Sequence, residues 1–324
     1  MKKKITKKIE FKKKSFLKNL ILVTGTHTSG KSMLAPVVAS LNKVEILRKI
    51  YTLDQLAILN NFKKIKKNTA SFIAKHILDQ SYYDQLIGRN MNFRYEDETS
   101  VATSKDPLNY KRRLRIKRGP KVLKVHQKRG THMLVDTHDG VWFYEFWKNL
   151  NIKNMKIINI YRNPIDIVNS WINLDLGEAE KQLLCQIPLI NYKNKTKVFY
   201  LLNNIKKKYS SKYDRIIDMV VQCVNNEIEN YKKIKNNKDI IRIDFDDFAA
   251  NTKYFIGRIE KFLKLKRTKF TNKILIRENL PRVINIKDRE KKRKMIKSKT
   301  TAHFYNKLLK LEQKLIKNKT IFKI

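Results

Sequence analysis

The feature that most constrains the fold of this chain is the segment of residues 25–32, which reads GTHTSGKS. It matches the pattern G-x-x-x-x-G-K-S, follows the apolar run of residues 20–24 and precedes a helix expected over residues 33–41. Glycines in such a loop let backbone N–H groups turn inward around an anion, and the helix N-terminus adds partial positive charge. A strand, a phosphate-binding loop and a helix in this order predict an α/β domain built on a parallel sheet.

A second segment, residues 156–171, reads KIINIYRNPIDIVNSW and combines a strand with a helix. Its Ile-rich run predicts a buried strand, Asn163 can cap a helix, and Pro164 suits a first helical turn. Arg162 therefore falls at the carboxyl end of the strand and Ser170 on the following helix. Ligands of open α/β sheets bind at that edge, where a guanidinium and a hydroxyl can hold a phosphate. A solvated arginine and a surface serine are the alternative.

A third segment, residues 133–138, reads MLVDTH and predicts a strand that ends in His138. Imidazole titrates near neutral pH, so this histidine could accept the proton of a hydroxyl nucleophile. A structural histidine bonded to backbone is the alternative, and Asp139 and Glu145 are weaker candidates for a base.

In their order and spacing, these segments resemble the PAPS-dependent sulfotransferases (PAPS is 3′-phosphoadenosine-5′-phosphosulfate), over roughly residues 20–265. The resemblance implies that Arg162 and Ser170 bind the 3′-phosphate and that His138 is the catalytic base. It also implies that Lys31 neutralises charge on the bridging oxygen as the product PAP leaves, and that no metal is needed. The residues that it assigns to the 5′-phosphosulfate are Thr28, Ser29, Gly30, Lys31 and Ser32.

The chain departs from that family at three positions. Thr28 stands where the family usually has Lys or Arg, Lys31 stands where it usually has Thr or Ser, and Asp136 replaces the Lys of a K-T-H strand end. These departures keep a second hypothesis open, a P-loop kinase or other NTPase that uses ATP and Mg²⁺ with Asp136 as the metal-binding acid.

The resemblance predicts transfer of a sulfuryl group from PAPS to a hydroxyl group, with a carbohydrate or other glycan as the expected acceptor. The polar segment of residues 88–100 is expected to cover the site or to contact the acceptor, with Arg89 and Arg94 as the contact residues. An ordinary surface excursion is the alternative. Basic residues near 277–282 and 289–299 lie where the family places a loop over the 3′-phosphate. The sequence does not identify which of them would contact that phosphate.

The 324 residues carry a formal net charge of +44, from 73 Lys and Arg against 29 Asp and Glu. Such a field attracts polyanions, which suits an anionic saccharide acceptor and favours attraction to anionic membranes. It also supports a third hypothesis, a non-catalytic polyanion-binding module. An AT-rich genome explains the same charge, and no specific nucleic acid partner is expected. Cys185 and Cys223 make no disulfide framework, and no stretch is long enough to span a bilayer, so a cytoplasmic location is expected.

The predicted fold class is a P-loop NTPase-like three-layer fold with a central parallel sheet and helices on both faces. Residues 1–18 are expected to form a basic mobile leader, residues 19–280 the sulfotransferase-like α/β domain, and residues 281–324 a basic, partly helical C-terminal segment. Other expected elements are strands at 122–125 and 240–243, helices at 213–234, 255–265 and 304–316, and helical pieces over 182–209.

Overall fold

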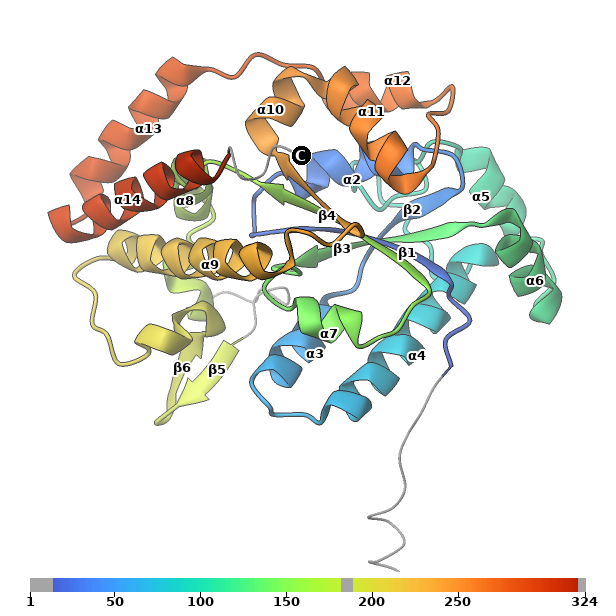
Figure 1. Ribbon diagram of the computed structural model, residues 1–324, viewed down its shortest axis with the longest axis horizontal. Helices are drawn as coiled ribbons and strands as arrows, with labels where there is room; N and C mark the ends of the chain where they lie inside the picture. The colour runs from blue at the N-terminus through green and yellow to red at the C-terminus, as the bar shows by residue number, and fades with distance from the viewer. Residues whose placement is uncertain (1–13, 182–188, 320–324) are drawn as a thin grey trace, which may run out of the picture. The chain divides into compact units, whose positions relative to one another are not determined.

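The structure is a computed structural model that describes residues 14–181 and 189–319, so most of the expected leader lies outside the described residues. Within the described residues, five strands form one sheet with the order β2-β3-β1-β4-β7 (Figure 1). Strands β2 and β3 pair in parallel, with Leu47 opposite Leu134. The predicted α/β fold class with a central parallel sheet is confirmed. The strands are β1 Asn19–Gly25, β2 Val44–Lys49, β3 His132–His138, β4 Asn154–Tyr161 and β7 Ile240–Asp244.

Strand β1 and the helix after it form as the sequence pattern predicts. The apolar residues Leu20, Ile21, Leu22 and Val23 are completely buried. A run of this kind, with no polar alternation, is typical of a strand covered on both faces. The loop follows at once, and α2 (Lys31–Ala39) begins inside the glycine motif, two residues earlier than expected. The loop is therefore held between a buried strand and a helix N-terminus.

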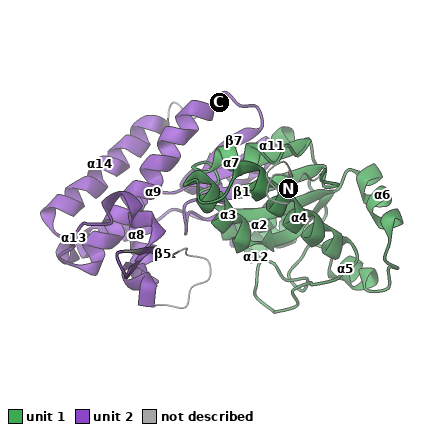
Figure 2. Ribbon diagram, turned by 90° about the horizontal axis from the view of Figure 1, so that it is seen from below, with its two compact units in different colours: residues 1–23, 32–157, 259–278 green, residues 24–31, 158–258, 279–324 purple. Residues whose placement is uncertain are grey.

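The chain divides into two compact units, coloured separately in Figure 2. Unit 1 comprises residues 1–23, 32–157 and 259–278. Unit 2 comprises residues 24–31, 158–258 and 279–324. Loop residues 25–31, Arg162 and helix α8 belong to unit 2, whereas Ser32 and His138 belong to unit 1.

In unit 1, helix α3 packs against α4, α7 and β3. The predicted strand at 122–125 is wrong, because these residues lie in helix α6. Pro120 occupies the first helical turn and Gly130 ends the helix in the left-handed conformation, which are the usual start and stop signals of a helix. The helices here are α3 Tyr51–Asn61, α4 Lys67–Leu86, α5 Pro107–Arg113, α6 Pro120–Arg129, α7 Tyr144–Lys148 and α12 Thr271–Arg277.

In unit 2, the long helix α9 (Lys212–Ile234) packs against α8 and α14. Its buried stripe, which includes Ile217, Val220, Val224 and Ile228, follows the predicted 3.6-residue period. The other helices are α8 Pro164–Asn173, α10 Phe245–Ala250, α13 Ile286–Lys299 and α14 Ala302–Lys319, with 3₁₀ turns at Leu176–Lys181 and Phe199–Asn204. Helix α11 (Thr252–Leu263) contains residues of both units. No helix within the described residues combines the length and the apolar character that a membrane span requires.

The prediction of helical pieces over 182–209 is wrong for residues 189–198, and residues 182–188 lie outside the described residues. Strands β5 (Leu189–Tyr192) and β6 (Lys195–Val198) form an antiparallel hairpin. Lys193 and Asn194 connect them, and both have positive φ, 49° and 59°. Two-residue hairpin loops favour this conformation, but they are usually signalled by Asn-Gly or Asp-Gly, which the sequence lacks here.

Candidate active site

The phosphate loop of unit 2 is a tight turn with unused polar groups in its interior. The Ser29 amide donates to the Thr26 carbonyl at 3.0 Å, and Thr28 has a φ of 65°, a strained value for a β-branched residue. The hydroxyls of Thr28 and Ser29 are buried and have no hydrogen-bond partner among the residues that the structure describes. Buried hydroxyls normally find a partner, so these groups are suited to an anion that accepts hydrogen bonds.

Lys31 lies against its own loop. Its Nζ donates to the carbonyl oxygens of Gly25 at 3.0 Å and Thr26 at 3.1 Å, and the residue is only 5% exposed. An ammonium has three donors, so these two contacts leave one for another acceptor. The next residue, Ser32, is exposed in the first turn of α2.

Arg162 extends from the end of β4 to the phosphate loop. Its Nη1 donates to the Thr28 carbonyl at 3.2 Å, and its guanidinium lies 4.6 Å from the centroid of the Phe245 ring. The Nε of Arg162 is buried and has no hydrogen-bond partner within residues 14–181 and 189–319. The structure thus brings together two segments that the sequence singles out separately, the phosphate loop and the arginine at the strand end.

Helix α8 is attached to the same loop. Asn163 caps it by accepting from the Ile165 amide at 2.9 Å, and Pro164 occupies its first turn, as the sequence predicts. Trp171 donates from its indole Nε1 to the His27 carbonyl at 3.1 Å. Ser170 precedes this anchor and is half-buried. The strand, arginine and helix are confirmed as local structure, whereas the roles of Arg162 and Ser170 stay predictions.

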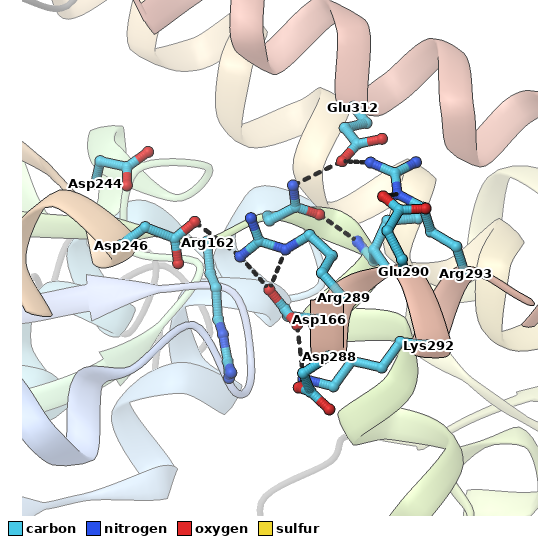
Figure 3. Close-up of polar contacts among 12 residues, drawn as sticks. Arg162, Asp166, Asp244, Asp246, Asp288, Arg289, Glu290, Lys292, Arg293 and Glu312 are labelled. Atoms are coloured by element: carbon cyan, nitrogen blue, oxygen red, sulfur yellow. Dashed lines mark hydrogen bonds and ion pairs between the residues drawn. The ribbon is translucent and has the colours of Figure 1, made fainter. Parts of the chain in front are cut away.

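Ion pairs from α13 neutralise the carboxylates near Arg162 (Figure 3). Arg289 donates to Asp166 at 2.6 Å and to Asp246 at 2.8 Å, and Lys292 lies 3.0 Å from Asp166. Burial alone would raise the pKa of Asp166, but the hydrogen bond from Lys292 and the charge of Arg289 outweigh it and lower that pKa. In Figure 3 the Arg162 side chain extends away from these ion pairs.

Arg162 itself is a desolvated cation. Burial lowers the pKa of its guanidinium, while the carboxylates of Asp166 and Asp246 act in the opposite direction. A buried guanidinium with an unused donor gains more from a bound anion than an exposed one does. Arg162 also lines a pocket of about 370 Å³, together with Arg289, Arg293 and, on its apolar side, Leu315. The same pocket is also lined by the carboxylates of Asp244, Asp246, Glu290 and Glu312, so the feature that favours an anion here is the unused Nε donor of Arg162.

Sequence analysis missed a buried carboxylate beneath the loop. Glu227 on α9 is 2% exposed and accepts from the Thr26 hydroxyl at 2.9 Å and from the Asn159 side-chain amide at 2.5 Å. It ties the loop to both β4 and α9. The signal was present in the sequence, because Glu227 interrupts the apolar stripe of α9 between Val224 and Ile228, where a charge needs a buried partner.

Replacing Gly30 with alanine should destabilise unit 2 strongly. Gly30 has a φ of 103°, and a Cβ placed on it would overlap ring carbons of Phe245, the ring on which Arg162 lies. The strained backbone and the overlap together should lower the free energy of unfolding by about 2–4 kcal/mol, as measured by denaturant titration.

Gly257→Ala is the matched control for that experiment. Gly257 lies within helix α11, and a Cβ on it would meet nothing within 4 Å. Alanine there should be neutral or stabilising by up to about 1 kcal/mol. Equal effects of the two substitutions would contradict the close packing assigned to Gly30.

In unit 1, His138 lies at the end of β3, as predicted, with its side chain 14% exposed. Its Nδ1 is 3.1 Å from Oδ2 of Asp54, a residue that sequence analysis did not select. Asp136, two residues earlier, is buried, and its Oδ2 lies 4.0 Å from Nζ of Lys49. His138 and Asp136 therefore each have a polar partner within unit 1.

The predicted acceptor contacts, Arg89 and Arg94, differ in their surroundings. Arg89 forms an ion pair with Asp84 at 3.2 Å, and its side chain is 43% exposed. Arg94 is exposed, and its backbone amide donates to Oδ1 of Asn92 at 2.8 Å. Both residues lie in unit 1, and their role in acceptor binding stays a prediction.

Comparison with protein-family models finds no match, and comparison with curated proteins finds none either. Comparison with solved structures finds sulfotransferases among its matches. A sulfotransferase domain from the Synechococcus PCC 7002 olefin synthase is 8% identical, with 95% of this chain and 98% of that chain covered and a TM-score of 0.48. A sulfotransferase from Alicyclobacillus acidocaldarius is 12% identical, with 90% and 95% covered and a TM-score of 0.38. The mouse sulfotransferase SULT7A1, complexed with PAP, is 12% identical, with 81% and 64% covered and a TM-score of 0.37. In fold, sulfotransferases are what this chain is similar to.

Proposed function

We propose that this protein transfers a sulfuryl group from PAPS to a hydroxyl group of an acceptor. The observation that supports the proposal most is the contact between Arg162 and the Thr28 carbonyl, in which a half-buried guanidinium lies on a phosphate loop. The two buried loop hydroxyls and the unused Nε of Arg162 fit a ligand that carries anionic oxygens near both groups. A doubly phosphorylated adenosine has that character.

We propose that residues 28–32 bind the 5′-phosphosulfate and that Arg162 and Ser170 bind the 3′-phosphate. PAPS, when bound, supplies an activated sulfuryl group. Lys31 is proposed to offer the donor that its loop carbonyls do not use and to neutralise charge near the transferring group. His138 is proposed to accept the proton of the acceptor hydroxyl.

We propose an anionic carbohydrate or other anionic glycan as the acceptor, with Arg89 and Arg94 among its contacts. The support for this proposal is the net charge of +44 and the exposure of both arginines. Binding to a saccharide array tests this proposal. The protein should bind sulfated or carboxylated glycans more strongly than neutral ones.

Thermal unfolding distinguishes the sulfotransferase from the kinase hypothesis. PAP without magnesium should raise the unfolding temperature by about 4 °C at a hundredfold excess over its Kd, because binding stabilises only the folded chain. ATP with Mg²⁺ should raise it less. Stronger protection by ATP with Mg²⁺ would favour the kinase, with Asp136 as its acid. Binding that falls steeply with salt and ignores the nucleotide would favour a polyanion-binding module.

A further inference from the structure

A buried carboxylate in unit 1 holds both the backbone and the side chain of His138. Asp54 lies in the first turn of α3 and is 5% exposed. Both of its oxygens are 3.3 Å from the His138 backbone amide, and Oδ2 is 3.1 Å from Nδ1 of the imidazole. Its Oδ1 also accepts from the Thr137 hydroxyl. One side chain therefore contacts both residues of the Thr-His strand end.

These contacts define which ring nitrogen of His138 carries the proton. The hydroxyl and the amide that contact Asp54 are donors, which is the environment of an ionised carboxylate. An ionised carboxylate only accepts, so Nδ1 must donate to it as N–H. The neutral imidazole then has its lone pair on Nε2, the nitrogen that faces away from Asp54.

The ring plane of His138 is also restrained. Tyr51, three residues before Asp54 on the same helix, stacks on the imidazole with a centroid distance of 6.4 Å and an interplanar angle of 28°. Strand β3 carries a carboxylate of its own, Asp136, two residues before His138. Asp136 lies near Lys49, which also forms an ion pair with Glu98. Asp54 is in hydrogen-bond contact with the ring through Oδ2.

We infer that Asp54 is a positioning residue, which fixes His138 in the Nδ1–H form, so that the lone pair of the neutral ring is on Nε2. The inference rests on the proposed function for the identity of the reaction, in which Nε2 accepts the hydroxyl proton of the acceptor. It does not depend on that function for the protonation state of the ring. Asp54 acts through His138 and has no contact with substrate assigned to it.

The test is ¹⁵N NMR of the histidine side chains of the full chain, with the His138 signals assigned by their loss in His138→Ala. Wild-type protein above the imidazole pKa should show a protonated Nδ1 and an unprotonated Nε2. Asp54→Asn, which keeps the shape but can donate as well as accept, should move the proton toward Nε2. In an assay with PAPS and an acceptor, it should lower kcat by about 10²-fold or more and leave the Kd of PAP unchanged.

Asp79→Asn is the matched control. Asp79 is another buried carboxylate of unit 1, and it accepts from Ser15 at 2.6 Å and from the Leu17 amide at 3.1 Å. It should leave the His138 signals unchanged. Thr137→Val removes the hydroxyl that shares Oδ1 and should keep the Nδ1–H form, because Oδ2 still accepts from the ring.

Two results would overturn the inference: a wild-type ring protonated at Nε2, or a proton position that Asp54→Asn does not alter. A different result would contradict the proposed function alone. If wild-type protein transfers no sulfuryl group while the ring shows the expected response to Asp54→Asn, the pairing stands and the reaction assigned to it is wrong.

Discussion

Arg162→Ala should remove most of the protection that PAP gives against thermal unfolding. The guanidinium is half-buried, lies on the Phe245 ring and has an unused donor at its buried Nε, so it is already oriented when an anion arrives. Each hydrogen bond to a charged group contributes about 1.5–3 kcal/mol, so the loss of two such bonds corresponds to a Kd about 10²–10⁴-fold weaker. Calorimetric titration of PAP measures this change directly.

The PAP affinities of wild type and Arg162→Ala must be compared with those of further variants, because the 73 basic residues attract any anion. These variants separate the charge of Arg162 from the shape of its guanidinium. Arg162→Lys keeps the charge but loses the planar fork, so its affinity should lie between those of wild type and alanine. Arg267→Ala removes an arginine of unit 1 that is paired with Glu260 at 3.0 Å, and it should leave PAP binding unchanged. If PAP protects Arg162→Ala as well as it protects wild type, the assignment of Arg162 to the nucleotide is wrong.

His138→Ala should abolish sulfuryl transfer while PAP binding persists. A general base contributes about 10²–10⁴-fold to the rate, and the phosphate loop and Arg162 are untouched by the substitution. Single-turnover measurements with saturating PAPS should show the loss in the chemical step, with the Kd of PAP within about twofold of wild type.

His303→Ala provides the control for loss of an imidazole. His303 is exposed in unit 2, at the start of α14, and should be replaceable without effect on turnover. Unchanged turnover in His138→Ala would exclude it as the base and direct attention to Asp139 or Glu145. A weaker affinity for PAP in His138→Ala would show that the substitution also disturbs nucleotide binding.

The sequence was sufficient to predict those parts of the site that depend on neighbouring residues. The loop follows from an apolar strand and a glycine pattern, and the position of Arg162 follows from a strand that ends where Asn163 and Pro164 start a helix. The fold class followed from the same strand and helix patterns. These features depend on residues that are close in the sequence, so a short segment is enough to predict them.

Contacts between distant residues could not be predicted in this way. Asp54 reaches His138 across 84 positions, and Glu227 reaches Thr26 across 201. Nothing local marks Asp54 as different from other acidic residues in a first helical turn, because its partner is set by the packing of α3 on β3. The incorrect strand at 122–125 has a different cause, since a short apolar run fits a helix as well as a strand.

Helix α13 can affect anion binding at Arg162 through its ion pairs, without contacting the ligand. Arg289 and Lys292 satisfy Asp166 and Asp246, two acids whose fields reach Arg162. Were those acids left unmatched, they would compete with an incoming anion for the same guanidinium. Helix α13 begins more than 120 positions after Arg162. Substitutions of Arg289 or Lys292 in it should weaken anion binding at Arg162, because they leave the nearby carboxylates without their ion-pair partners.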